Sequence, residues 1–140
     1  MESSEAPERV VQAQVDAFNK RDLEKFLSYY VQDIVILDGL GNQMMKGYDG
    51  MRPFYSKLFH QSPNLNVEIK NRIVVRQHVL DEEQITGVNV EGVPSELHSA
   101  AIYRIAGGKI VHVQLLWYII AEFDAEKIPV QIALDFQYFA

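Results

Sequence analysis

The segment DIVILDGLGNQ, residues 33–43, offers a carboxylate at a position where acid–base chemistry is possible. Ile34 to Leu37 form an apolar run typical of a short strand, and Asp38 follows at its end, before a Gly-Leu-Gly turn. A carboxylate that points into an apolar cavity can act as a general base or acid. An Asp that opens a turn instead faces water and hydrogen-bonds the nearby backbone. The residues alone leave both interpretations open.

Gln14 is a second polar residue in a position that invites a role. Val11, Val15 and Phe18 recur at helical spacing, and Gln14 falls on the same face of that helix. A buried amide must find a hydrogen-bond partner, because burial without one is costly. We expect Gln14 to donate to a ligand oxygen, to bond a neighbouring side chain, or to reach the rim of the domain.

The first half of the chain must position these residues, and it is expected to be mainly helical. A helix is predicted over Pro7–Asn19, with Pro7 in the tolerant first turn, and a second helix follows the N-cap Asp22. A strand over Ile34–Leu37 and a short segment over Gln43–Lys46 come next. Asp49 is expected to cap a third helix, which ends at QSPN.

The second half has the pattern of strands. The segments LNVEIKNRIVVRQHVL, QITGVNV, ELHSAAIYRI and KIVHVQLLWYII are separated by DEE, EGVP and AGG. Such short breaks between long strands predict antiparallel hairpins, with DEE as a solvated hairpin tip. Helices followed by an antiparallel meander indicate an α+β fold.

Length and composition predict one domain over residues 1–140, with a core over 8–117 and a C-terminal extension over 118–140. The extension is amphipathic and can dock on the domain, on a partner subunit or over a pocket. The net charge of −6, without a basic cluster, argues against nucleic acid and anionic membranes as partners. The sequence has neither a signal peptide nor an apolar run long enough to span a membrane, so we expect a cytoplasmic protein.

Metal and cofactor sites are not expected. The chain has no Cys, and its four histidines, His60, His78, His98 and His112, lack the spacing of a metal site. His98 and His112 are expected on the outer face of the sheet, where they can be neighbours across two strands. Neither a nucleophile elbow nor a complete dinucleotide-binding pattern is present.

Three motifs in order carry a family resemblance: AFNKRDLEKFLSYYVQDIVILDG, then GYDGMRPFYSKLF, then YRIAGGKI before a strand that closes in Trp. From Glu8 to Trp117 the chain resembles the nuclear-transport-factor-2-like superfamily, in particular its steroid delta-isomerase-like and SnoaL-like polyketide cyclase branches. The resemblance implies a cone-shaped, curved antiparallel sheet packed on three N-terminal helices. It also implies an apolar pocket for a small hydrophobic molecule inside the cone.

The resemblance implies roles for particular residues. Asp38 falls where steroid isomerases place their general base, while Gln14 and Ala101 fall where their two oxyanion donors lie. A Gln amide can donate a hydrogen bond, but an Ala side chain cannot. The other residues that are expected to face the pocket are Phe18, Phe26, Tyr30, Phe54, Tyr55, Phe59, Ser99, Tyr103, Val113, Leu115 and Trp117.

Two functions follow from this resemblance, because the superfamily contains both enzymes and non-catalytic modules. In the first, Asp38 is the general acid or base of an isomerase- or cyclase-type proton transfer. In the second, the protein is a ligand-binding or dimeric association module. In both cases the resemblance implies a homodimer through the convex face of the sheet, with His112 and Gln114 at the interface.

Overall fold

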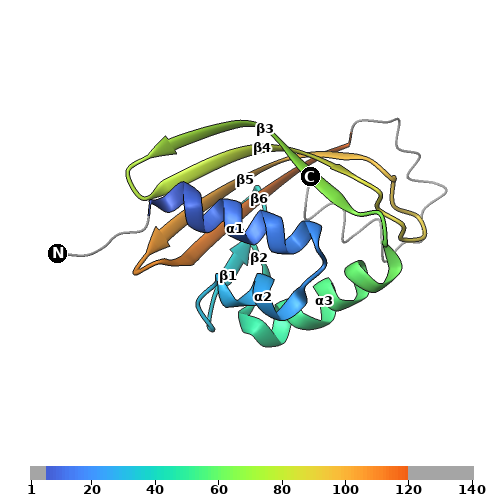
Figure 1. The fold of residues 1–140 in the computed structure, drawn as a ribbon, viewed down its shortest axis with the longest axis horizontal. Helices are drawn as coiled ribbons and strands as arrows, with labels where there is room; N and C mark the ends of the chain where they lie inside the picture. The colour runs from blue at the N-terminus through green and yellow to red at the C-terminus, as the bar shows by residue number, and fades with distance from the viewer. Residues whose placement is uncertain (1–5, 120–140) are drawn as a thin grey trace.

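The computed structural model describes the backbone of residues 6–119 and the side chains of residues 6–116 (Figure 1). The elements follow in the order α1 (Pro7–Asn19), α2 (Leu23–Ser28), β1 (Val35–Leu37), β2 (Gln43–Lys46), α3 (Gly47–Gln61), β3 (Asn66–Val75), β4 (His78–Thr86), β5 (Leu97–Ala106) and β6 (Lys109–Ile119). No helix among the described residues is long and apolar enough to cross a membrane. The greater part of the predicted C-terminal extension, residues 120–140, lies outside the described residues.

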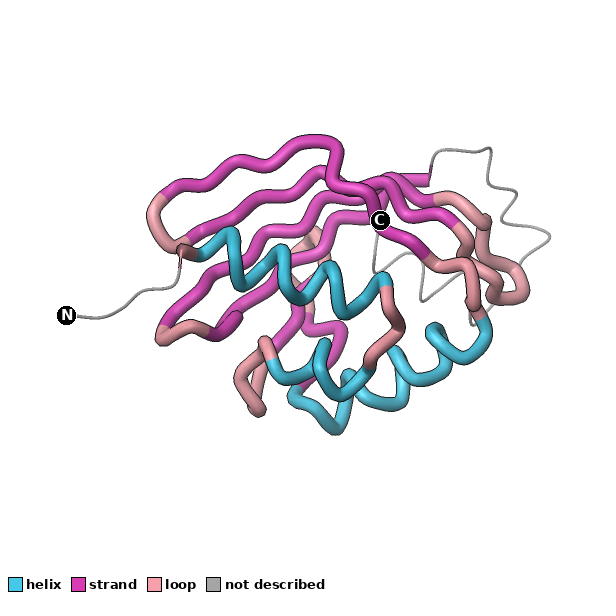
Figure 2. Tube along the Cα trace, in the orientation of Figure 1, coloured by secondary structure: helices cyan, strands magenta, loops and turns pink. Residues whose placement is uncertain are grey.

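The strands form one curved, six-stranded sheet in the order β2-β1-β6-β5-β4-β3 (Figure 2). Neighbouring strands are antiparallel, except that β1 runs parallel to β6. The three helices lie on the concave face of this sheet, and α1 runs across the long strands (Figure 1). The predicted α+β fold, a curved sheet packed on three N-terminal helices, is confirmed.

Two of the three helices begin at the predicted residues. The helix α1 has the predicted bounds, and the Asp22 carboxylate accepts a hydrogen bond from the Lys25 amide at 3.3 Å, as expected of an N-cap. The helix α3 begins at Gly47, two residues before the predicted cap Asp49. Gly47 has a φ of +67°, which glycine adopts readily, and this conformation lets the chain pass directly from β2 into the helix.

The predicted position of the first hairpin is wrong. The chain turns at Arg76 and Gln77, and the DEE segment lies inside β4 instead of at a solvated tip. Asp81 and Glu83 are buried on the concave face, which they share with Val79 and Ile85. The three carboxylates make this stretch look like a loop, although its alternate positions follow the period of two of a half-buried strand.

Aromatic rings from the helices and from Tyr30 pack against one another between the helices and the sheet. Phe26 is buried and lies edge-on or tilted against Phe18, Tyr30, Tyr55 and Phe59, with ring centroids 4.8–5.9 Å apart. Such edge-to-face contacts add to the gain from apolar burial.

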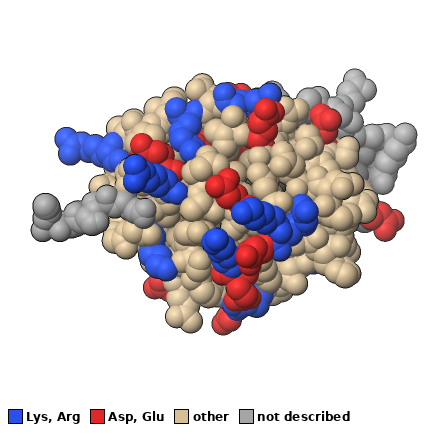
Figure 3. All heavy atoms as spheres, viewed as in Figure 1, with Lys and Arg blue, Asp and Glu red and all other residues tan. Residues whose placement is uncertain are grey.

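The outer surface on the helix side is charged. Lys and Arg side chains are interspersed there with Asp and Glu side chains (Figure 3).

Candidate functional site

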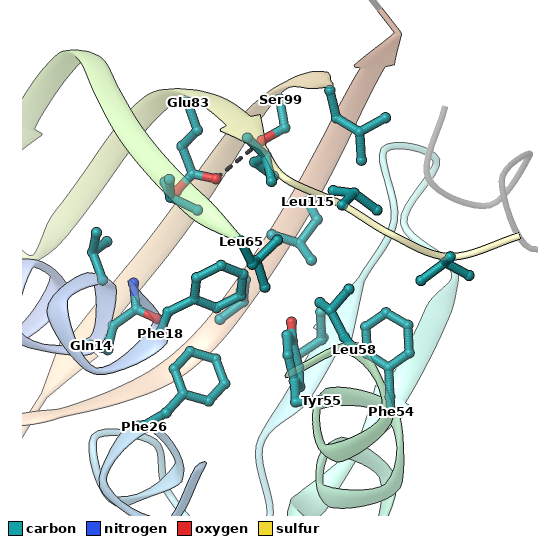
Figure 4. Close-up of a pocket in the computed structure, with 18 of the residues that line it drawn as sticks. Gln14, Phe18, Phe26, Phe54, Tyr55, Leu58, Leu65, Glu83, Ser99 and Leu115 are labelled. Carbon is teal, nitrogen blue, oxygen red and sulfur yellow. Dashed lines mark hydrogen bonds between the residues drawn. The ribbon is translucent and has the colours of Figure 1, made fainter. Parts of the chain in front are cut away.

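A cavity of about 270 Å³ lies between the three helices and the concave face of the sheet (Figure 4). Its walls are mostly apolar, and Phe18 and Phe26 from the helices lie across it from Glu83 and Ser99 on the sheet (Figure 4). Ten of the predicted pocket residues line it: Gln14, Phe18, Phe26, Tyr30, Phe54, Tyr55, Ser99, Tyr103, Val113 and Leu115. The chain therefore brings these residues together, as the family resemblance implied.

The remaining predicted residues are placed differently. Phe59 is buried among the rings of Phe18, Phe26 and Tyr55 and does not line the cavity. Ala101 is fully buried beneath the cavity wall, because its small side chain does not reach the open space. Trp117 pairs with Ser99 in the sheet through its backbone, but its side chain lies outside the described part of the structure.

Asp38 is buried, but it does not line the cavity. Its Oδ1 accepts hydrogen bonds from the backbone amides of Leu40 and Asn42 at 2.9 and 2.8 Å, which closes the Gly-Leu-Gly turn. Its Oδ2 is buried without a hydrogen-bond partner among the described residues. The turn-forming interpretation therefore describes its geometry, although the side chain is not solvated. The acid–base role of Asp38 stays a prediction, and the structure does not bring this residue to the cavity.

Among the described residues, the carboxylate that lines the cavity is Glu83, which was expected in a solvated hairpin tip. It extends from β4 and accepts hydrogen bonds from Ser99 Oγ at 3.0 Å and from Tyr103 Oη at 3.5 Å. Burial, and to a lesser extent the charge of Asp81, raises the pKa of Glu83 to about 7, against the opposing effects of the bonds from Ser99 and Tyr103 and of the Arg72 charge. A carboxyl group with this pKa exchanges protons readily near neutral pH.

Asp81 is next to Glu83 on the concave face, but its charge is paired. Its carboxylate accepts two hydrogen bonds from the Arg72 guanidinium, at 2.6 and 2.8 Å, and Arg72 also donates to Gln12 of α1 at 2.9 Å. Within the described residues, no cation forms an ion pair with Glu83. Glu83 is therefore the acidic group of the cavity whose charge is not balanced by a salt bridge.

A chain of hydrogen bonds runs from the helices to Glu83. Tyr30 Oη donates to Gln14 Oε1 at 2.8 Å, Gln14 Nε2 donates to Tyr103 Oη at 3.2 Å, and Tyr103 donates to Glu83. Burial raises the pKa of the Tyr30 and Tyr103 hydroxyls, so both remain protonated donors at neutral pH. Gln14 thus has the buried hydrogen-bonding role that the sequence left open, with side-chain partners.

The sequence contained a signal for Glu83 that the prediction did not use. Val79, Asp81, Glu83 and Ile85 follow the strand period, and their burial needed only the correct turn at residues 76–77. Three consecutive carboxylates are usually solvated. Here Arg72, Ser99 and Tyr103 supply the partners, and they come from other strands.

The two histidines that were expected on the outer face of the sheet are not paired across strands. His112 pairs across strands with Arg104, and His98 with Tyr118, so the expected contact of His98 with His112 is wrong. In the described part of the chain, no group of three or more His, Cys, Asp or Glu side chains is arranged to hold a metal ion.

Comparison with known proteins gives a consistent family relationship. The sequence model of the SnoaL-like domain matches residues 11–113. Among curated proteins, none matches the chain.

Several solved structures share the fold. One is a cystatin fold protein from Novosphingobium aromaticivorans, 25% identical, which covers 81% of this chain and 99% of its own at a TM-score of 0.72. Another is a protein with a ketosteroid isomerase-like fold from Catenulispora acidiphila, solved in complex with trimethylamine. It is 20% identical and covers 87% of this chain and 95% of its own, at a TM-score of 0.66. An NTF2-like protein from Cytophaga hutchinsonii is 11% identical, covers 84% of this chain and 94% of its own, and has a TM-score of 0.65.

Proposed function

Since the chain belongs to the SnoaL-like family, we propose that its cavity takes a small hydrophobic molecule and that Glu83 moves a proton on that molecule. The observation that carries this proposal is a buried carboxyl group, with a pKa of about 7, in the wall of an otherwise largely apolar cavity. One acid placed among apolar walls is a common form of a catalytic site. Glu83 takes the role that the resemblance implied for Asp38.

The hydrogen-bond donors and acceptors around Glu83 indicate the class of ligand that suits the cavity. When Glu83 is ionised, the hydroxyls of Ser99 and Tyr103 have acceptors on its two oxygens. When Glu83 is protonated, the site gains one O–H donor and no acceptor. A ligand oxygen can accept from that donor, so the site suits a hydrophobic molecule that carries a carbonyl group.

Such a site can transfer a proton between carbons next to a carbonyl group. Ionised Glu83 takes a proton from the carbon, the C–H electron pair forms the enolate, and the developing oxyanion accepts a hydrogen bond from a tyrosine hydroxyl of the cavity wall. Protonated Glu83 then returns the proton to a carbon of the same molecule, so the reaction consumes no co-reactant. Donors placed in a dry site stabilise such a charge far better than water does.

Isotope exchange tests the proposal directly. The purified protein is mixed with a panel of hydrophobic cyclic ketones in D₂O, and deuterium entering next to the carbonyl is followed by NMR. We expect exchange in the native protein and a loss of at least about 100-fold in Glu83→Gln, since general base catalysis typically contributes factors of this size. Asp38→Asn is the matched carboxylate control: exchange that depends on Asp38 and not on Glu83 would reverse the assignment.

A second function is supported by the convex face of the sheet. Ile73, Leu80 and Ile102 occupy neighbouring positions on three adjacent strands there, and Ile73 is 52% exposed. An apolar row on an exposed sheet face is suited to association. The alternative is therefore a non-catalytic ligand-binding module that works as a homodimer through this face, and it predicts ketone binding without isotope exchange.

A further inference from the structure

The hydrogen-bond chain in the cavity wall has a direction. Tyr30 donates to Gln14, Gln14 donates to Tyr103, and Tyr103 donates to Glu83. Gln14 is the asymmetric link, because its amide accepts at Oε1 and donates at Nε2. In the arrangement seen, every proton of the chain points toward the carboxylate, which is the arrangement that an ionised Glu83 favours.

Protonation of Glu83 favours the opposite direction. A protonated Glu83 can donate a hydrogen bond to Tyr103 Oη. The Tyr103 proton is then free, and it can bond Gln14 Oε1 if the Gln14 amide rotates by 180°. The turned amide then presents Nε2 to Tyr30 Oη, and the Tyr30 proton loses its acceptor. Tyr30 lines the cavity, so that proton is available to an oxygen atom of a bound molecule.

From this geometry we infer that Gln14 is a positioning residue that couples the protonation of Glu83 to the hydroxyl of Tyr30. No covalent bond changes apart from the protonation of Glu83 itself. The consequence for binding is that a ligand oxygen meets a donor at Tyr30 when Glu83 carries its proton. The chain thus links the charge of the acid to the place where the ligand's polar group is held.

This inference rests on Glu83 being the working carboxyl group of the cavity, but its test needs no substrate. The pKa of Glu83 is measured by NMR on protein labelled with ¹³C in the glutamate carboxyl groups, with the signal assigned from Glu83→Gln. Tyr30→Phe removes a hydroxyl that makes no direct hydrogen bond to Glu83 in the structure. We expect it to raise the pKa of Glu83 by roughly half a unit to one unit, the equivalent of one modest hydrogen bond.

The coupling through Gln14 is tested in a double-mutant cycle. Gln14→Leu should raise the pKa of Glu83 by itself, and adding Tyr30→Phe to it should produce no further shift. Gln14→Met serves where the Leu variant does not fold. Tyr55→Phe is the matched control, because Tyr55 is a buried tyrosine of the same cavity that takes no part in the chain.

Each outcome decides the inference. An unchanged Glu83 pKa in Tyr30→Phe would overturn it, as would an equal shift in the presence and absence of Gln14. An equal shift in Tyr55→Phe would show that any lost tyrosine hydroxyl has the same effect, which also overturns it. If the Glu83 pKa shows this dependence on Tyr30 and Gln14 but the native protein shows no isotope exchange, only the proposed reaction is contradicted.

Discussion

At the scale of single residues, the ionisation of Glu83 makes a pH-dependent contribution to stability. Burial raises its pKa from 4.5 to about 7, so the folded protein holds a proton that the unfolded chain releases between these values. The free energy of unfolding therefore falls as the pH rises from about 4.5 to about 7, and the loss from this group is on the order of 3 kcal/mol. Glu83→Gln removes this contribution.

Urea unfolding at pH 5 and pH 8 measures the effect. We expect the native protein to lose more stability between these pH values than Glu83→Gln does, with a difference of about 2 to 3 kcal/mol. Glu91→Gln, at an exposed turn position, is the matched control and should follow the native protein. Parallel pH profiles for the native protein and Glu83→Gln would show that Glu83 is not buried as an acid.

At the scale of elements, the hairpin between β3 and β4 decides which side chains reach the cavity. Its turn places Arg76 at a φ of +53°, a conformation that costs a non-glycine residue about 1–2 kcal/mol. Arg76→Gly relieves this strain, while the greater freedom of glycine in the unfolded chain takes back about 0.5–1 kcal/mol. We expect a net gain of about 0.5 kcal/mol in the free energy of unfolding, measured in urea.

The same substitution separates the observed hairpin from the one predicted with its tip at DEE. In that alternative, residue 76 lies inside a strand, where glycine destabilises by about 0.5–1 kcal/mol. Val75→Gly is the internal control, since Val75 is in β3 in the observed structure and should show that loss. A loss of stability in Arg76→Gly would contradict the observed turn.

The elements also show how far the sequence determines the site. Helical spacing predicted α1, and alternation predicted which residues of β5 and β6 share a face, while the family resemblance identified the face with Ser99, Tyr103, Val113 and Leu115 as the pocket side. Glu83 was missed because its burial depends on partners from other strands, which no local pattern reveals. Asp38 was placed by its position at the end of a strand, but the backbone amides of its own turn hold its Oδ1. Local patterns together with the family resemblance thus predicted most of the cavity walls, while the acid of the cavity is determined by tertiary hydrogen bonds.

At the scale of the whole molecule, the two outer faces differ in a way that bears on association. Charges of both signs are interspersed over the helix side (Figure 3), which favours solvation. The sheet side presents Ile73, Leu80 and Ile102 in register across three strands, and Val75 nearby is 56% exposed. We therefore expect a second copy of the chain to cover the sheet side, in agreement with the homodimer that the resemblance implied.

A charge placed in the apolar row should break such a dimer. Ile102→Glu would bury one carboxylate from each copy in this interface, and unpaired charges are costly to remove from water. We expect the native protein to sediment as a dimer at micromolar concentration and Ile102→Glu to sediment as a monomer with an unchanged helix and strand content by circular dichroism. Glu24→Gln, on the helix side, changes the charge by the same magnitude and should leave the dimer intact. A native protein that stays monomeric at all concentrations would contradict the association function. It would leave the proposal for Glu83 unaffected, because isotope exchange tests that proposal independently.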